Sequence, residues 1–457
     1  MDTFQAAIQW VLNLGSAVFV PIIILILGLV ARMKFKRAFT SALTLGIAFT
    51  GMNLVIGFMT EAVGPASEAL ANNTGISLPA IDVGWTGAAS ITWSWVYAFT
   101  FFAIQIAINI LMLSFNWTKT LNVDMWNVWG KAFTAYFVYF VSGHLWAGFL
   151  VGIIQIILEL KLGDMFQRHI EDLTGIPLVT VTHPMSLTAA ILVPINKIMD
   201  YIPFLNKQYD ANSLKQKIGV FSENSVMGFV IGLGLGFLGA YAISDSLNLA
   251  VQVAAAMTLF PMISKLFMQS LSPLADAMSD YMKNRFQDRE IYIGMDWPIL
   301  AGRAEVWVTL ILLVPVFIGF ALILPGNKVL PIAGVLNYGL AISGLLLTGA
   351  NVVRMLILGV IFTPLFLYAS SYLAPMLTDL AKATGAVDVP ANRMITWSSM
   401  ETPEFRLSFA QAFAGNWIGI LCAIVFIGLF IWLYKEMTTV KVPSERYASL
   451  ENDSDGK

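Results

Sequence analysis

Long apolar stretches alternate with short polar ones along most of the chain. A helix that crosses a membrane needs about 20 predominantly apolar residues. Stretches close to or above that length lie at 10–31, 39–59, 96–115, 131–158, 226–243, 247–268, 306–324 and 412–434. Weaker stretches, short or interrupted by Gly and Pro, lie at 186–202, 332–349 and 353–373. The pattern predicts an all-α polytopic membrane protein with about eleven crossings.

Composition supports this prediction and excludes several kinds of chemistry. The 457 residues are 58% hydrophobic and 12% charged, whereas soluble domains carry about 25% charged residues. Cys422 is the only cysteine, so neither an intrachain disulfide nor a cysteine-based metal site is expected. ATPase, zinc-protease and serine-hydrolase motifs are absent from the sequence, and we expect no cofactor. The net charge of −2 argues against nucleic acid as a partner.

Positive charge predicts the orientation of the chain in the membrane. Basic residues follow the first apolar stretch at positions 32–37, and lysines cluster again at 197–217 and after 435. These segments should face the cytoplasm, which places the N-terminus outside and the C-terminus inside. Asp2 is the only charged residue before the first apolar stretch, so the positive start of a cleavable signal peptide is missing. We expect a transmembrane domain over 1–442 and a polar cytoplasmic tail over 443–457.

The two halves of the chain resemble each other weakly. The segments 58–70 and 267–278 each end an apolar stretch at a Pro, and each precedes a segment with Asp and Trp close together. Ser142-Gly143 and Thr348-Gly349 occupy similar places in their halves. By the predicted crossings the halves, about 10–202 and 226–434, run in opposite directions. Inverted repeats place interrupted segments at the membrane midplane, so the two Asp-Trp segments predict re-entrant hairpins. Ordinary surface loops with an anchoring Trp are the alternative.

Several strings carry a resemblance to a known family. They are Asp82-Val83-Gly84-Trp85, Asn122-Val123-Asp124-Met125-Trp126-Asn127-Val128-Trp129, Leu162-Gly163-Asp164 and Pro325-Gly326-Asn327-Lys328-Val329-Leu330-Pro331. The chain resembles, roughly from Leu14 to Leu433, the galactitol-type enzyme IIC of the bacterial phosphoenolpyruvate-dependent phosphotransferase system, within the ascorbate–galactitol superfamily. Where such chains have a Pro-His-Gly-Thr-Ser-like string, this one reads Thr182-His183-Pro184-Met185-Ser186, which leaves the exact polyol open.

The resemblance implies a homodimeric permease in the bacterial cytoplasmic membrane. A core domain that holds the sugar would move like an elevator against a scaffold domain at the dimer interface. The substrate would be a sugar alcohol, galactitol or a related polyol. A separate cytoplasmic IIB subunit would phosphorylate it, and IIA, HPr and enzyme I would supply IIB. Cys422 lies within the last apolar stretch, and no hydrophilic domain is appended, so the phosphoryl donor should belong to the partner.

Candidate binding residues follow from the chemistry of a polyol. A sugar alcohol is neutral and carries a hydroxyl on every carbon, so its site needs acceptors, amides or imidazoles and an aromatic face. Asp82 and Asp296, each beside a Trp in a predicted hairpin, are the leading candidates, because charges at membrane depth are usually functional. Asp296 could also act as the base that deprotonates the reacting hydroxyl. Capping of a short helix is the alternative for both.

Other candidates sit beside these aspartates or within apolar stretches. Gly84 and Thr86 would let the backbone approach the sugar, and Trp85 could stack on it, although a turn and an interfacial anchor are the ordinary roles. His144 lies in a predicted crossing, and His183 begins a weak one. Each could bind a hydroxyl or be a packed core residue. His169, among charged neighbours, is expected to be a solvated loop residue.

Buried structural roles are expected for a further group of polar residues. Asp124 and Asn127 should have a structural role at a domain junction, and Arg354, with Asn351, should pair with a carboxylate inside the bundle. Two other readings of the whole chain remain open. One is an ion-coupled secondary transporter in which Asp82 and Asp296 bind H⁺ or Na⁺. The other is a membrane enzyme acting on lipid, against which the lack of an acid–base motif argues.

Overall fold

The computed structural model describes residues 16–73, 78–93, 95–98, 100–124, 127–207, 224–285, 290–329, 331, 337–384, 389 and 394–443. Within these ranges it is predominantly helical, with a few very short strands. Four described helices are long and apolar enough to cross a membrane, at Leu145–Thr174, Ala304–Ile323, Val352–Ala383 and Trp417–Thr439. The expectation of a helical membrane protein is therefore confirmed, and the number of eleven crossings stays a prediction.

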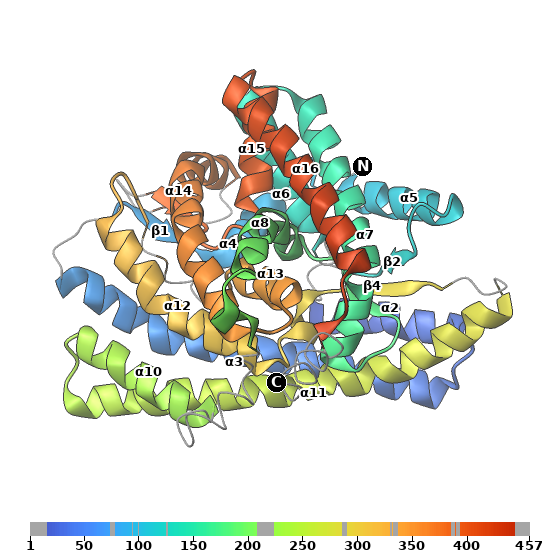
Figure 1. Cartoon of the computed structure of the whole chain (residues 1–457), viewed down its shortest axis with the longest axis horizontal. Coiled ribbons are helices and arrows are strands. Elements are labelled where there is room, and N and C mark those ends of the chain that lie inside the picture. The colour runs from blue at the N-terminus through green and yellow to red at the C-terminus, as the bar shows by residue number, and fades with distance from the viewer. Residues whose placement is uncertain are drawn as a thin grey trace.

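Four helices pack on one another as a layer along the lower edge of Figure 1. They are α2 (Ser16–Val30), α3 (Phe35–Asn73), α10 (Asn224–Leu238) and α11 (Ile243–Arg285). Glycines at every fourth position of α10 permit close contact with α11. A Cβ added at Gly228 or Gly232 would lie 2.7 or 2.6 Å from the Cα of Ala254 or Ala250. Small residues at this spacing are typical of helix pairs in membranes, where close backbone approach replaces the hydrophobic effect.

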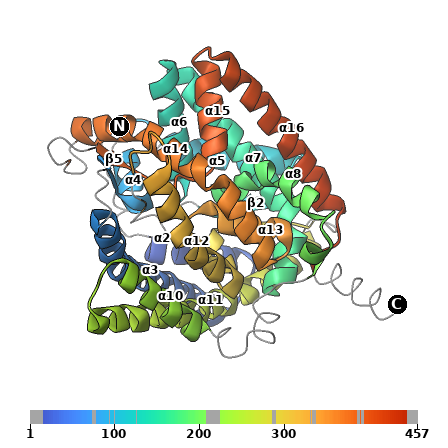
Figure 2. The same ribbon diagram turned by 60° about the vertical axis from the view of Figure 1, so that its left-hand side comes forward.

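The remaining elements form a second body above this layer (Figures 1 and 2). Its helices are α4 (Gly84–Trp93), α5 (Thr100–Ser114), α6 (Val128–Ser142), α7 (Leu145–Thr174), α8 (Ala189–Met199), α12 (Ala304–Ile323), α13 (Gly339–Thr348), α14 (Val352–Thr384), α15 (Pro403–Phe413) and α16 (Trp417–Thr439). Among the described residues it also contains the 3₁₀ turns η1 (Pro184–Thr188), η2 (Pro203–Asn206) and η4 (Trp297–Leu300).

Two small parallel sheets join segments that are far apart in the sequence. In the first sheet, β1 (Ala80–Asp82) pairs with β5 (Met394–Thr396), with Asp82 opposite Thr396. In the second sheet, β4 (Tyr292–Met295) lies between β2 (Thr120–Asn122) and β3 (Val179–Val181). Parallel strands cannot be joined by a tight turn, so each pairing ties distant parts of the chain together.

Side chains complete the exposed edges of these short strands. The amide of Asn109 donates to Thr120 O at 2.8 Å and accepts from Asn122 N at 2.8 Å, as a neighbouring strand would. Asp164 accepts hydrogen bonds from the hydroxyls of Thr118 and Thr120 at 2.8 and 2.9 Å. These contacts are the physical role of Asp164 in the Leu162-Gly163-Asp164 string, because they seat β2 against α7.

The predicted crossing at 131–158 is wrong as a single helix. Gly143, with φ of 73°, ends α6 in the left-handed conformation, and α7 begins at Leu145. Gly349, with φ of 65°, ends α13 in the same way, and α14 follows at Val352. Glycine adopts this conformation without the steric cost that other residues have. The similar places predicted for Gly143 and Gly349 are thus two equivalent breaks between helices.

The ends of several helices meet at one end of the molecule. The ring of His169 in α7 hydrogen-bonds Met437 O in α16 at 2.9 Å, and Lys197 of α8 pairs with Glu436 at 2.5 Å. Arg354, near the start of α14, pairs with Asp200 at 2.7 Å. The helix α14 therefore begins at the end of the molecule where α7 finishes, so the two helices run in opposite directions.

These contacts also test the predictions made for His169 and Arg354. His169 is 2% exposed, so the expectation of a solvated loop residue is wrong, because α16 covers the end of α7. Arg354 pairs with a carboxylate, as expected, and also donates to Leu205 O at 2.9 Å and Asn206 Oδ1 at 2.6 Å. Asn351 donates to Lys207 O at 2.8 Å. Together they hold the 200–207 segment in place.

Candidate substrate site

Asp296 lies at the turn between β4 and η4. The strand β4 is buried throughout, and its pairing with β3 and β2 carries the turn into the interior of the molecule. Asp296 caps η4, because its Oδ1 accepts a hydrogen bond from Trp297 N at 2.7 Å. Its side chain is 16% exposed. The capping role and a role toward a ligand are compatible here, since a carboxylate can accept several hydrogen bonds.

His183 faces Asp296 from the turn between β3 and η1. Its ring is 2% exposed, and its Nδ1 accepts from Met185 N at 3.3 Å. Its Nε2 lies 3.5 Å from Asp296 Oδ1 and 3.6 Å from Glu401 Oε1. Because β3 and β4 are neighbours in one sheet, their turns meet at the same edge, and this brings His183 and Asp296 together.

The start of α6 contributes polar groups beside this pair. Asp124 accepts from the backbone N and the side-chain Nδ2 of Asn127, at 3.1 and 2.6 Å. Lys131, one turn further along α6, donates to Asn127 O at 3.1 Å and pairs with Glu159 of α7 at 2.6 Å. The side chains of Lys131 and Glu159 are 1% and 0% exposed, so each compensates the buried charge of the other.

The turn before α15 supplies Glu401 and the beginning of that helix supplies Arg406. Arg406 donates to Glu401 O at 2.7 Å and to Thr134 Oγ1 at 2.8 Å. Its Nη2 lies 3.6 Å from Glu401 Oε2 and donates to Gly130 O at 3.3 Å. Both residues are buried, so Arg406 ties the Glu401 turn to α6.

The resulting buried cluster consists of Asp124, Asn127, Lys131, Glu159, His183, Asp296, Glu401 and Arg406. Both of its cations are engaged by protein acceptors, while two carboxylates face His183. The arrangement is rich in acceptors. It suits a neutral ligand with several O–H donors better than an anion, which would need an available cation.

Asp82 occupies the corresponding turn of the other sheet but has different surroundings. Its carboxylate accepts from Ser398 N at 3.0 Å, Ser398 Oγ at 2.6 Å and Gly84 N at 3.2 Å. Gly84 has φ of 63°, and Trp85 is half-buried. Thr86 lies in α4, and its side chain falls outside the described residues. Asp82 therefore binds Ser398 of the segment 396–401, whereas Asp296 faces His183 in the buried cluster.

The structure places His144 elsewhere. It lies in the exposed turn between α6 and α7, where its ring stacks beside Trp146 with a centroid distance of 6.0 Å. The expectation that it lies within a crossing is wrong, because Gly143 breaks the helix there. Its contact with a substrate stays a prediction, but it would act at the end of the molecule rather than in the buried cluster.

Sequence reasoning missed Lys131, Glu159, Glu401 and Arg406. A signal was present for the first two, since Lys131 begins the long apolar stretch 131–158 and Glu159 directly follows it. Charged residues at membrane depth are costly unless paired, so a lysine and a glutamate at such positions indicate a buried pair. Glu401 and Arg406 lie in a mixed polar segment that gave no such signal.

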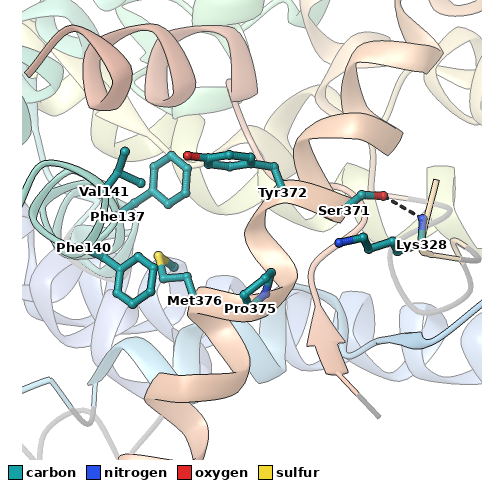
Figure 3. A pocket seen from close by; sticks show the side chains of 8 residues that line it. All are labelled: Phe137, Phe140, Val141, Lys328, Ser371, Tyr372, Pro375 and Met376. Carbon is teal, nitrogen blue, oxygen red and sulfur yellow. Dashed lines mark hydrogen bonds between the residues drawn. The ribbon is translucent and has the colours of Figure 1, made fainter. Parts of the chain in front are cut away.

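A cavity of about 380 Å³ lies between α6 and α14, close to the cluster. In Figure 3, Phe137, Phe140 and Val141 form one end of it, and Lys328 and Ser371 form the other. Phe137 stacks with Phe133 at 6.4 Å, and the ring of Phe133 lies 4.9 Å from the guanidinium of Arg406. Phe137 and Phe133 therefore connect the wall of this cavity to Arg406 of the buried cluster.

The long apolar helices define a class, the helical integral membrane proteins. Comparison with known proteins narrows that class. Residues 10–391 match the family described as the PTS system sugar-specific permease component, EIIC-GAT. The galactitol-specific EIIC components of the phosphotransferase systems of Escherichia coli K12 and O157:H7 are each 33% identical over 387 residues, covering 84% of this chain and 86% of theirs. The chain belongs to this family of phosphotransferase-system permease components.

Proposed function

We propose that the chain imports a sugar alcohol, galactitol or a related polyol, and presents it for phosphorylation by a separate IIB subunit. The acceptor-rich cluster around His183 and Asp296 is the observation that carries this proposal. A polyol offers many hydroxyl donors and no charge, so it can satisfy two buried carboxylates without the cost of an added anion. Similarity to galactitol-specific relatives supports the same choice of substrate class.

The phosphoryl step would use Asp296 as the base. The oxygen of one polyol hydroxyl forms a bond to phosphorus as the bond between phosphorus and the phosphorylated side chain of IIB breaks. The hydroxyl proton passes to the Asp296 carboxylate. Cys422, the one cysteine of the chain, is exposed on the apolar helix α16 rather than near the cluster. The phosphoryl donor is therefore assigned to IIB, which IIA, HPr and enzyme I keep phosphorylated.

We further propose two inverted repeats, about 10–202 and 226–434, with β1–α4 and β4–η4 as hairpin tips. The opposite directions of α7 and α14 support this, as do the matching breaks at Gly143 and Gly349. The layer of α2, α3, α10 and α11 would be the scaffold of a homodimer, against which the second body moves like an elevator. The end that carries Lys197 and Arg354 would face the cytoplasm, together with the tail after 442.

The cavity between α6 and α14 would be the approach to the site from the outer end. Tyr372 in its wall accepts a hydrogen bond from Gln411 Nε2 at 2.6 Å, near the end of α15 that leads into α16. That end lies opposite the proposed cytoplasmic end.

Uptake of labelled hexitols and pentitols tests the function. Cells that express the chain with its cognate IIA and IIB should accumulate at least one of these polyols as its phosphate. Accumulation of unmodified polyol without IIB would instead favour an ion-coupled transporter. Uptake of a sugar acid in preference to every polyol would contradict the argument from the buried acceptors.

A further inference from the structure

The turn between β5 and α15 presents a second carboxylate to His183, opposite Asp296. Glu401 is 3% exposed, and its two oxygens have different neighbours. Oε2 lies 3.6 Å from Arg406 Nη2, and Oε1 lies 3.6 Å from His183 Nε2. The carboxylate therefore has one oxygen toward a cation and one toward the imidazole that also faces Asp296.

Arg406 is held so firmly that it determines where Glu401 can lie. Its Nε donates to Thr134 Oγ1 at 2.8 Å, and its guanidinium lies 4.9 Å from the ring centroid of Phe133 and 5.5 Å from that of Trp397. It also donates to the backbone oxygen of Glu401 at 2.7 Å. A rigid fork that binds both the backbone and the carboxylate of one residue leaves that residue little freedom.

The hydrogen bond to Nδ1 determines the tautomer of His183. Met185 N donates to Nδ1, so Nδ1 carries a lone pair and the proton of the neutral ring is on Nε2. This Nε2 lies 3.5 Å from Asp296 Oδ1 and 3.6 Å from Glu401 Oε1. Both distances exceed the 2.7–3.2 Å typical of N–H···O bonds. One donor and two acceptors thus lie close together at separations longer than a direct hydrogen bond.

A hydroxyl group placed among these three atoms would satisfy them. Its oxygen would accept from His183 Nε2, and its hydrogen would go to one carboxylate. A neighbouring hydroxyl of the same ligand would donate to the other carboxylate. We propose that Glu401 is a substrate-binding residue that, with Asp296, accepts hydrogen bonds from two adjacent hydroxyls, and that Arg406 is its positioning residue. This inference rests on the proposed function and names the groups of the polyol that the site recognises.

The variant Glu401→Gln tests it, with Glu404→Gln as the matched control. Glu404 lies three residues further along the chain, in the first turn of α15, where it accepts from Thr402 Oγ1 at 2.8 Å. Binding of the polyol found by the uptake panel is measured on the purified full-length protein, together with the thermal unfolding midpoint with and without polyol. Glu401→Gln should weaken binding by about 10–100-fold, the range for losing a hydrogen bond to a charged group. Glu404→Gln should bind like the wild type.

Further measurements separate binding from folding. Glu401→Asp retains the charge and should recover part of the affinity, whereas a purely structural role would make it as unstable as the Gln variant. On the wild type, the polyol lacking one of the two recognised hydroxyls should bind at least 10-fold more weakly, and Glu401→Gln should remove that difference. Wild-type affinity in a folded Glu401→Gln protein would overturn the inference. If the wild type binds no polyol, the proposed function fails instead.

Discussion

At the scale of single residues, identical side chains in similar motifs differ in how far protein donors already occupy their hydrogen-bonding positions. Asp82 accepts hydrogen bonds from Ser398 and Gly84, whereas Asp296 accepts from Trp297 N and the side chain of Asn127 and also faces a histidine and a second carboxylate. The motif Asp-Trp is therefore insufficient to assign a role. The neighbours supplied by other parts of the chain decide which carboxylate is available to a ligand.

Asp296→Asn distinguishes the roles proposed for this residue. The amide keeps the size of the side chain and removes its charge and basicity. If Asp296 is the base, polyol binding should survive while phosphorylation falls by about 10²–10⁴-fold. The measurement is binding to the purified protein alongside phosphorylation in membranes supplied with IIA and phosphorylated IIB. Normal binding and normal phosphorylation would remove Asp296 from the site.

Asp82→Asn should act mainly on stability. An amide would present N–H groups toward Ser398 N or Oγ, leaving a buried donor unsatisfied, at a cost of about 1–3 kcal/mol. The thermal unfolding midpoint should fall, while affinity for polyol at a temperature where the variant is folded stays near that of the wild type. A selective loss of affinity with an unchanged midpoint would support the sequence-based prediction that Asp82 binds the substrate.

At the scale of elements, short strands depend on neighbouring helices whose side chains form hydrogen bonds with them. The strand β2 is seated by Asn109 of α5 and Asp164 of α7, and it brings Asn122 and Asp124 toward the cluster. Gly163 permits this contact, because a Cβ there would lie 2.7 Å from the side chain of Thr120. Helix packing against the sheet thus positions the polar residues that follow β2.

Gly163→Ala should disturb this contact. The added methyl group would push Thr120 away, so we expect a loss of about 1–3 kcal/mol from overpacking, and weaker polyol binding because the start of α6 shifts. Gly319→Ala in α12 is the control, since its Cβ would meet no atom within 4 Å. Thermal unfolding of the two variants in the same detergent provides the comparison. Equal midpoints would show that α7 accommodates the methyl group.

At the scale of the whole molecule, the buried cluster draws on both halves of the chain. Lys131, Glu159 and His183 come from the first half, and Asp296, Glu401 and Arg406 come from the second. Because strands of one half pair with strands of the other, displacement of either half would change the site. In a permease that opens alternately to the two sides of the membrane, one part of the protein moves against another around such a shared site.

Cysteine labelling tests the proposed inverted hairpins. In a Cys422→Ser background, whose uptake should stay within a few-fold of wild type, single cysteines replace Thr86 or Pro298. The first should react more readily with a membrane-impermeant reagent added outside, and the second with reagent added to inverted vesicles. Bound polyol should protect both positions. Equal labelling of both cysteines from one face would contradict the inverted arrangement.

The sequence by itself determined the membrane class, the family resemblance and the candidates Asp296 and His183. Hydropathy is a sum over neighbouring residues, so it can be calculated from the sequence alone. A charge at membrane depth is costly wherever it occurs, so a charged residue within an apolar stretch can also be recognised without the tertiary structure. The weak internal similarity also indicated Gly143 and Gly349 as corresponding positions, and in the structure both adopt the left-handed conformation that glycine reaches without strain.

Only the tertiary structure decided which charges meet. The approach of Glu401 to His183, and the hydrogen bonds of Arg406 to Thr134 and Gly130, result from strand pairing and helix packing between distant segments. The same packing buried His169, exposed His144 and surrounded Asp82 with protein donors. A contact between residues more than a hundred positions apart depends on the free energy of packing the whole chain, which no local pattern contains.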